Sequence, residues 1–318
     1  MKVMMIGCGR WGSLIAWYLS TLSHEVTLYG RESSANMQRF LRERKNDLLT
    51  LPSSVTLTTG LAAARDAEVI LISVPAQSLR ALLREPTLRA LRDKTFVLCM
   101  KGIEVETGMR LSQVTAAEVD RSNHIAVWLG PGHVQDFYAG IPNCMVIDSD
   151  EDAVKCRLID AFSGKLIRFY YGDDMIGNEI GAAAKNVIGI AAGVLDGLGL
   201  STLKGALMSR GTREVARLIA AMGGNERSAY GLCHLGDYEA TLFSPYSHNR
   251  AYGEGLITGA PMTKLAEGHP TAAALHKLAA ENGVEMPIVS AVYSILYEGA
   301  APKEAIDRLF ERRQGQEF

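Results

Sequence analysis

The chain has 318 residues, 47% of them hydrophobic, which is enough for a large core and, at this length, for two domains. Its 33 Lys and Arg residues are matched by 35 Asp and Glu, and the formal net charge of -2 leaves no basic surplus to bind a nucleic acid or an anionic membrane surface. No apolar run reaches the roughly 18 residues that a membrane span needs, and no signal peptide is visible, so we expect a cytoplasmic protein without membrane insertion.

The first half of the chain alternates strand-length apolar runs with helical patterns such as 11–22. Strands are predicted at 2–7, 25–30, 68–75, 95–102, 125–131 and 144–149. Because their apolar residues are continuous and helices separate them, these strands predict a parallel sheet covered on both faces. We therefore expect an α/β fold whose N-terminal part is a Rossmann-like, doubly wound sheet.

The second half of the chain is helical in pattern. The Ala-rich stretch 176–199 is too long for a strand, and further helical patterns lie at 202–222, 270–282 and 287–298. We expect an all-helical C-terminal domain, with the boundary near 170–175. The predicted domains are therefore 1–173 and 174–318.

The cysteines and histidines give no sign of a disulfide framework or a metal site. The five cysteines form no CxxC pair, and the seven histidines show no HxxxH or HExxH spacing. We therefore predict reduced thiols and no bound metal.

The hexapeptide GCGRWG follows the first predicted strand and opens the first predicted helix. In this context Gly7 allows a tight turn, Gly9 lets the backbone approach a pyrophosphate, and Gly12 lets helix and strand pack closely. The anion would lie on the free N–H groups at the helix N-terminus. The motif predicts a dinucleotide site in which Arg10 and Trp11 also contact the cofactor.

Two features beyond this loop concern the same cofactor. The second predicted strand ends at Gly30 and Arg31, where an acidic residue normally binds the ribose 2′-hydroxyl. An arginine followed by Ser33 and Ser34 suits a 2′-phosphate better, so the sequence predicts NADP or NAD, with NADP favoured. Pro75 ends another strand, in a turn that we expect beside the cofactor.

Taken together, the motifs resemble one family, the bacterial-type NAD(P)-dependent glycerol-3-phosphate dehydrogenases. The similarity runs through nearly the whole chain and includes SVPAQSL, CMKGI, GAAAKNVIGIAAGVLDGLG, GLCHLGDYEATLFSPYSHNRAYGEGL and GVEMPIVSAVYSILYEG. The resemblance implies a reversible hydride transfer between NAD(P)H and C2 of dihydroxyacetone phosphate, giving sn-glycerol 3-phosphate. It also implies that the helical domain binds substrate and forms a homodimer, and that the enzyme serves phospholipid biosynthesis.

The resemblance assigns the chemistry to three residues. Lys185, in a small and apolar helix, corresponds to the family's general acid/base; burial lowers the pKa of such an ammonium group and a nearby anion raises it again. Asp237 matches the aspartate that holds this lysine and contacts the substrate. Lys101, at a strand end, matches the lysine that contacts both substrate and cofactor. Without the resemblance, the two lysines would be interpreted as solvent-exposed and Asp237 as an N-cap.

Further site residues follow from the same likeness. Thr241 lies four residues after the aspartate, within reach of it if that segment is helical. The other expected substrate contacts include Gly130, at the end of a predicted strand, and Asn186, next to the catalytic lysine. Leu265 and Glu267 match cofactor contacts near the nicotinamide ribose.

The segment SHNR departs from the family pattern. His248 stands where the family usually has an arginine that binds the substrate phosphate and the cofactor, whereas Ser247, Asn249 and Arg250 are kept. A histidine is only partly charged at neutral pH. A dianion held by His248 is therefore expected to bind more weakly as the pH rises, unless Arg250 compensates.

Two further departures lie near the expected pocket. In the segment GPGHV, Gly132 removes a hydroxyl expected near the substrate and Val134 replaces an alanine beside the cofactor. The second departure is at residues 199–207, which replace a Gly-Asp-Asn-Thr-Lys pattern. A small phosphorylated ketone or alcohol remains the expected substrate. The alternatives are a paralogous NAD(P)-dependent reductase of a related ketone with an altered anion pocket, a ketopantoate-reductase-like or β-hydroxyacid-dehydrogenase-like enzyme, and a non-catalytic NADP-binding sensor.

Overall fold

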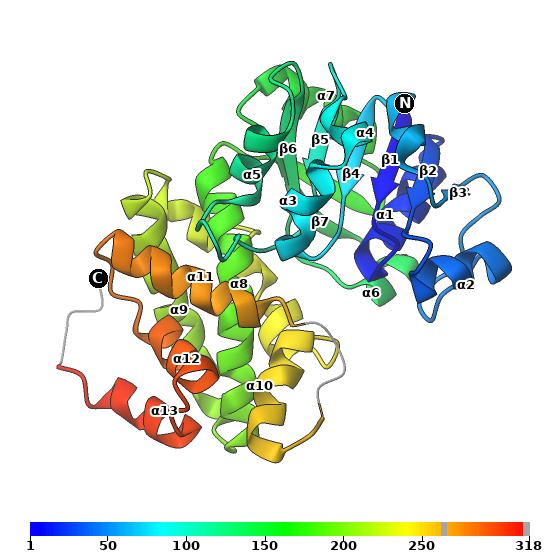
Figure 1. Ribbon diagram of the computed structural model, residues 1–318. Helices are drawn as coiled ribbons and strands as arrows, with labels where there is room; N and C mark the ends of the chain where they lie inside the picture. Colours follow the sequence, from blue (N-terminus) through cyan, green and yellow to red (C-terminus); the bar gives the residue numbers. More distant parts are fainter. Residues whose placement is uncertain (262–265, 314–318) are drawn as a thin grey trace.

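The computed structural model describes residues 1–261 and 266–313, which form a sheet domain followed by a helical domain (Figure 1). One eight-stranded sheet makes up the first domain, in the order β3-β2-β1-β4-β5-β6-β7-β8. The strands are β1 Lys2–Ile6, β2 Glu25–Tyr29, β3 Thr56–Thr58, β4 Val69–Ile72, β5 Thr95–Leu98, β6 His124–Leu129, β7 Asn143–Asp148 and β8 Ile167–Tyr171. The expected Rossmann-like sheet followed by a helical domain is confirmed.

The sheet differs from the prediction at its edges. The sequence patterns predict neither β3, an edge strand of three residues, nor β8, which lacks a continuous buried run. The expectation of a fully parallel sheet is also wrong, because β7 pairs antiparallel with β6 and β8 then follows β7 in parallel. The connection from β6 to β7 contains one short helix, α6, Val134–Tyr138. Its five residues are too few to return the chain to the end of the sheet at which β6 begins.

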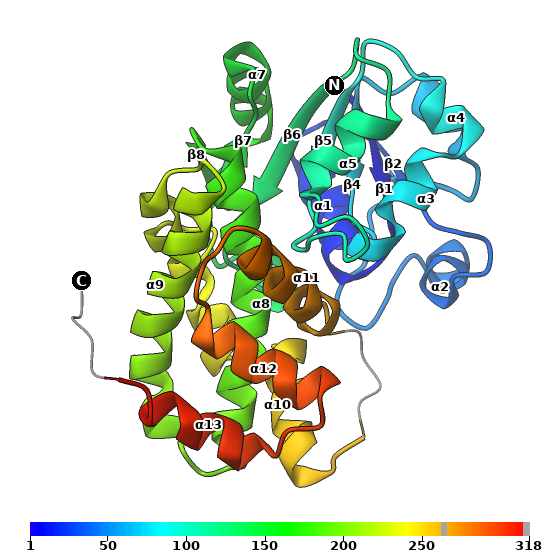
Figure 2. The ribbon, with the colours of Figure 1, turned by 60° about the vertical axis from the view of Figure 1, so that its left-hand side comes forward.

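Helices cover both faces of the sheet (Figures 1 and 2). They are α1 Arg10–Thr21, α2 Ala35–Glu43, α3 Leu79–Leu83, α4 Pro86–Arg89, α5 Leu111–Glu118 and α7 Asp152–Phe162. Alternate residues of β1 enter different cores: Val3 and Met5 pack with α1 and α7, whereas Met4 and Ile6 pack with α3 and α5. This alternation is what a strand buried on both faces produces, and it explains the continuous apolar run of the sequence.

The helical domain is built around one long central helix, α8 (Figure 2). Its helices are α8 Met175–Gly197, α9 Lys204–Ala221, α10 His248–Thr258, α11 Gly268–Glu281, α12 Pro287–Tyr297 and α13 Pro302–Phe310. Within the described part of the chain, α8 is the one helix long and apolar enough to cross a membrane, but 89% of its apolar window is buried inside the protein. It is therefore the core helix of this domain, and the other helices pack around it.

Small residues let α8 and α10 approach closely. A Cβ atom on Gly193 would lie 1.9 Å from the carbonyl oxygen of Arg250, and one on Gly253 would lie 2.0 Å from that of Ile190. Neither position has room for any side chain, so the two glycines set the distance between the helices.

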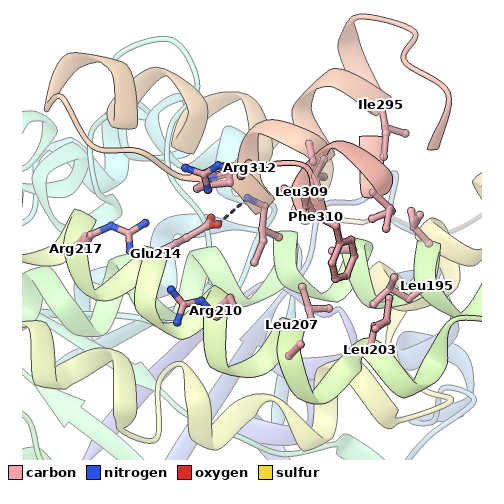
Figure 3. A pocket seen from close by; sticks show the side chains of 18 residues that line it. Leu195, Leu203, Leu207, Arg210, Glu214, Arg217, Ile295, Leu309, Phe310 and Arg312 are labelled. Carbon is pink, nitrogen blue, oxygen red and sulfur yellow. Dashed lines mark hydrogen bonds between the residues drawn. The ribbon is translucent and has the colours of Figure 1, made fainter. Parts of the chain in front are cut away.

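An apolar hollow lies between α8, α9, α12 and α13 (Figure 3). At one end of it, the buried carboxylate of Glu214 accepts hydrogen bonds from the backbone N–H groups of Ile288 (2.7 Å) and Val289 (3.3 Å), in the first turn of α12. Arg210, Arg217 and Arg312 surround this end. Burial raises the pKa of Glu214 to about 7, although the two N–H groups lower it in part.

Glu214→Gln is expected to stabilise the protein at pH 8 and to have little effect at pH 4.5. The folded state holds a proton on Glu214 up to about pH 7, whereas the unfolded chain releases it near 4.5, so ionisation lowers folding stability as the pH rises between these values. We expect a gain of about 2 kcal/mol in the free energy of unfolding at pH 8, measured by urea denaturation. Glu298→Gln, at an exposed site, is the control. An equal gain at both pH values would contradict this interpretation.

Candidate active site

The loop between β1 and α1 presents bare backbone to a cleft. Gly7 has a φ of 113°, and a Cβ there would lie 2.1 Å from the carbonyl oxygen of Ser73. A Cβ on Gly12 would lie 1.9 Å from the carbonyl oxygen of Gly7, so neither glycine can be replaced without a shift of the backbone. A Cβ on Gly9 would meet nothing within 4 Å, and Gly9 lines the cleft. These three positions fit the close approach of a dinucleotide pyrophosphate.

The cleft continues along the carboxyl ends of β1, β2 and β4. Arg31 and Ser34, which follow β2, both line it, as does Pro75 after β4. The position where an acidic residue normally binds the adenosine 2′-hydroxyl is therefore occupied by the cation Arg31, and the hydroxyl of Ser34 follows it. Glu85 also lines the cleft, and nothing in the sequence pattern singled it out.

A pair of lysines shares one buried carboxylate. The ammonium group of Lys185, on α8, lies 3.0 Å from Oδ2 of Asp237 and donates to the hydroxyl of Thr241 at 2.8 Å. The ammonium group of Lys101, just after β5, lies 2.5 Å from the same Oδ2 and donates to the carbonyl oxygen of Gly130 at 2.6 Å. The structure thus brings together five predicted residues from both domains.

The surroundings of Lys185 lower the pKa of its ammonium group. Burial is the largest cause and lowers the pKa of Lys185 to about 8; the carboxylate of Asp237 raises it in part, and the neighbouring charge of Lys101 lowers it further. An amine with such a pKa is able to exchange a proton near neutral pH.

A turn of unusual geometry positions the carboxylate. Asp237 closes a 3₁₀ turn, and a π-helical turn, Glu239–Phe243, follows it and carries Thr241. The hydroxyl of Thr241 donates to the backbone carbonyl of Asp237 at 2.7 Å, which leaves a lone pair for the lysine. Sequence spacing alone predicts an ordinary helical contact here.

A buried histidine supports this turn. Nδ1 of His234 lies 2.8 Å from the carbonyl oxygen of Gly181 on α8, and Nε2 lies 2.6 Å from the hydroxyl of Tyr238. Because a carbonyl only accepts, Nδ1 carries the proton and Nε2 accepts from the tyrosine. Burial lowers the pKa of His234 to about 4, so the ring stays neutral. The turn carrying Asp237 is thereby fixed against the helix carrying Lys185.

A chain of amide hydrogen bonds joins the two domains. The amide of Asn186 donates to the carbonyl oxygen of Lys101 at 3.1 Å and accepts from the amide of Asn249 at 2.9 Å. Asn249 in turn accepts from the backbone N–H of Gly268 at 2.9 Å. Beside it, the carboxylate of Glu267 accepts from the backbone N–H of Ala76 at 3.3 Å.

A pocket lies between this chain and the sheet. Its walls include seven predicted residues: Trp11, Lys101, Gly132, Asn186, His248, Asn249 and Glu267. Ser73, Val74, Cys99 and Met100 also line it, at strand ends that the sequence predicts but whose side chains it does not distinguish. Ser73 and Val74 line the dinucleotide cleft as well, so the pocket and the cleft share a wall. Leu265 lies outside the described residues.

Two glycines after β6 have backbone roles. Gly130 has a φ of 128° and Gly132 a φ of 142°, a conformation that other residues rarely adopt. A Cβ on Gly132 would also lie 2.2 Å from the ring of Phe137, so the ring leaves no room for a side chain at this position. Val134 is buried in the core against α1 and lines neither the pocket nor the cleft.

The segment 247–250 begins α10, and its residues point in different directions. The hydroxyl of Ser247 accepts from the backbone N–H of Arg250 at 3.3 Å and caps the helix. The guanidinium of Arg250 turns to Asp196, at 2.8 Å, and to Glu254, at 3.1 Å. Arg250 therefore does not face the pocket. Two carboxylates hold its guanidinium in this structure, and the role of Arg250 in binding substrate stays a prediction.

His248 contacts a residue of the dinucleotide loop. Its Nε2 lies 2.6 Å from Nη1 of Arg10, and Nη2 of Arg10 is 3.4 Å from Oε1 of Gln135. The sequence predicts both Arg10 and His248 at the site but gives no sign that they touch.

Comparison with known proteins agrees with this geometry. The family model for the N-terminal part of NAD-dependent glycerol-3-phosphate dehydrogenase matches residues 2–155. The family model for the C-terminal part of the same enzyme matches residues 174–307. Glycerol-3-phosphate dehydrogenase (NAD(P)+) of a Bradyrhizobium species is 38% identical over 98% of this chain and 96% of its own length; that of Streptomyces coelicolor is 36% identical with the same coverages. The crystal structure of glycerol-3-phosphate dehydrogenase from Coxiella burnetii has a TM-score of 0.91 and 28% identity, covering 98% of this chain and 99% of that one.

More distant structures share the fold alone. A ketopantoate reductase from Ralstonia eutropha has a TM-score of 0.62 at 14% identity, covering 97% of this chain and 99% of that one. D-mandelate dehydrogenase has a TM-score of 0.61 at 14% identity, covering 94% of this chain and 98% of that one. Identity at this level carries no argument about the substrate.

Proposed function

The chain belongs to the NAD-dependent glycerol-3-phosphate dehydrogenase family, and from that premise we propose that it interconverts dihydroxyacetone phosphate and sn-glycerol 3-phosphate. It is an NAD(P)-dependent dehydrogenase that acts on a CH–OH group. The observation that carries the substrate proposal is the buried cluster of Lys185, Asp237 and Lys101 beside a pocket that shares a wall with the dinucleotide cleft. The cofactor, when bound, supplies or accepts the hydride.

Lys185 is the proposed general acid/base. Reduction of a ketone places negative charge on the former carbonyl oxygen, which must receive a proton. An ammonium group with a pKa of about 8 is mostly protonated at pH 7 and is acidic enough to donate it; in alcohol oxidation the neutral amine accepts it back. Its hydrogen bond to Thr241 and its contact with Asp237 support this role, because they hold the ammonium group in place.

The charge of the cluster suits an anionic substrate. Two ammonium groups face one carboxylate, which leaves one surplus positive charge in a poorly solvated site. Lys101 holds the substrate oxygen in this proposal, and Asn186 and Asn249 supply amides for its hydroxyl group. Such preorganised donors stabilise the developing alkoxide without reorganisation during the reaction.

The test of this function is turnover of dihydroxyacetone phosphate with NADPH or NADH, followed by the loss of reduced-cofactor absorbance. We expect saturable turnover at submillimolar to millimolar substrate, in the usual range of KM values. Absence of turnover at millimolar substrate would rule the proposal out. A panel of other phosphorylated and unphosphorylated ketones then separates a paralogous reductase, which turns over one of them, from a sensor, which binds NADP(H) and turns over none.

We also propose three finer properties on the strength of the family likeness. The chain divides functionally at 173/174, works in the cytoplasm in phospholipid biosynthesis, and forms a homodimer through the helical domain. The oligomeric state is tested by size-exclusion chromatography with light scattering; a monomer at micromolar concentration would contradict the homodimer.

Arg31→Ala is expected to raise KM for NADPH about tenfold and to leave KM for NADH nearly unchanged. We propose that the guanidinium contacts the 2′-phosphate, and about 1.5 kcal/mol is the lower end of what a hydrogen bond to a charged group contributes. The measurement is steady-state kinetics with each cofactor in turn. Arg42→Ala, on the exposed face of α2, is the matched control. An equal rise for both cofactors would place Arg31 away from the 2′ position.

A further inference from the structure

The proposed substrate carries a phosphate dianion, and most cations near the pocket are already paired within the part of the chain that the structure describes. Lys101 and Lys185 both contact the carboxylate of Asp237. The guanidinium of Arg250 is held by Asp196 and Glu254. A phosphate dianion therefore requires a further positive charge at the rim of this pocket.

Arg10 is a cation of a different kind. Its guanidinium lies at the junction of the two domains, 2.6 Å from Nε2 of His248 and 3.4 Å from Oε1 of Gln135, and neither partner is a carboxylate. Partial burial lowers its pKa from the ordinary value, which reflects desolvation without a compensating anion. His248, which it touches, lines the pocket directly.

The contact with Arg10 also indicates the protonation state of the His248 ring. A guanidinium N–H only donates, so Nε2 of His248 must offer a lone pair to it. In this contact the ring is neutral and holds Arg10 by accepting from it. The histidine therefore does not supply the charge that the sequence pattern assigned to position 248.

We propose that Arg10 binds the phosphate of the substrate and that His248 positions Arg10 for that role. The charge comes from the dinucleotide loop of the sheet domain, and the contact with His248, which lines the pocket, holds it beside the pocket across the domain boundary. This inference rests on the proposed function, because it presupposes a phosphorylated substrate. It replaces the expectation that Arg10 contacts the cofactor and His248 holds the dianion.

The experiment compares Arg10→Met, Arg10→Ser, His248→Arg and the double variant Arg10→Ser/His248→Arg with the wild-type holoenzyme. For Arg10→Met we expect kcat/KM for dihydroxyacetone phosphate to fall about 10- to 100-fold, the range for loss of a hydrogen bond to a charged group. The rate with unphosphorylated dihydroxyacetone and KM for NADPH are expected to change by no more than about twofold, well below that range. Arg92→Met, an exposed arginine paired with Asp120, is the control.

The double variant makes the test reciprocal. His248→Arg alone is expected to give no gain in affinity for dihydroxyacetone phosphate, because the new guanidinium would face Arg10. In the Arg10→Ser background the same change is expected to restore most of the lost kcat/KM, since it returns one guanidinium to the same place. A double-mutant cycle isolates this coupling.

Three outcomes overturn the inference: unchanged kinetics in Arg10→Met, an equal loss with unphosphorylated dihydroxyacetone, or a rise in KM confined to NADPH, which would assign Arg10 to the cofactor. Failure of the proposed function is distinguishable, because the wild-type enzyme itself would then lack turnover. In that case the role of Arg10 is tested by calorimetric titration of the NADP-saturated protein with inorganic phosphate, which measures the affinity for the anion. Binding that is equal in wild type and Arg10→Met would overturn the inference.

Discussion

Lys185→Met is expected to lower kcat for dihydroxyacetone phosphate reduction by about 10³-fold or more and to leave NADPH binding intact. The upper part of the range for general acid–base catalysis applies, because Lys185 is buried and bulk solvent has little access to replace its amine. Stopped-flow or steady-state assays measure kcat, and cofactor fluorescence measures NADPH binding. Folding is checked by comparing the thermal unfolding midpoint with that of the wild type.

Lys185→Arg separates charge from proton transfer. Arginine keeps a positive charge beside Asp237, but its pKa is too high for it to act as an acid or base near neutrality. We expect it to be nearly as inactive as methionine. If it retained most of the activity, Lys185 would act by its charge alone and another group would carry the proton.

The pH dependence follows from the same amine. Ketone reduction needs the ammonium form, so its kcat/KM is expected to fall as the pH rises through about 8; alcohol oxidation needs the neutral amine and is expected to rise over the same interval. Parallel profiles in the two directions would contradict the assignment to Lys185.

Asp237→Asn is expected to lower kcat by about 10²-fold and to destabilise the protein by about 3 kcal/mol, the cost of removing one partner of a buried ion pair. Two ammonium groups would then face each other without a carboxylate. Because Asp237 raises the pKa of Lys185, its loss is expected to move the pH midpoint of ketone reduction below 8. Urea denaturation and pH–rate profiles measure the two effects. Asp173→Asn, on the exposed surface, is the control; a midpoint that stays at 8 would show that the carboxylate does not act on Lys185.

Local patterns predicted the parts of this fold that local chemistry determines. The β1–α1 loop was predictable because three glycines, a strand and a helix follow one another within the first 21 residues, and the structure requires the glycine at both Gly7 and Gly12. The edge strand β8 was not predictable, because only one of its faces is buried and its residues include Arg168 and two exposed tyrosines. The antiparallel turn at β7 depends on the length of a connection whose helix is only five residues long.

In the candidate site, too, some residues could be predicted from local sequence motifs and some contacts could not. Lys185, Asp237 and Lys101 were found because each lies in a motif that resembles a family, and the structure brings their charged groups within 3.0 Å of one shared oxygen. The contact between Arg10 and His248 spans 238 residues and leaves no trace in spacing or periodicity. Gly132 was interpreted as a lost hydroxyl, but the ring of Phe137 explains it, and that ring is placed only by the folded turn.

The close contact of α8 with α10 has a consequence for how mutations in this protein are interpreted. Lys185 and Asn186 stand on α8, and His248 and Asn249 stand on α10, so the spacing set by Gly193 and Gly253 also sets the width of the pocket. Gly193 lies eight residues beyond Lys185, about 12 Å along the helix at 1.5 Å per residue. A methyl group there would separate the helices and act on turnover without touching any reacting group. In a saturation mutagenesis screen for activity, substitutions at these two glycines would lower turnover as substitutions at the catalytic residues do, although the glycines contribute only by leaving space.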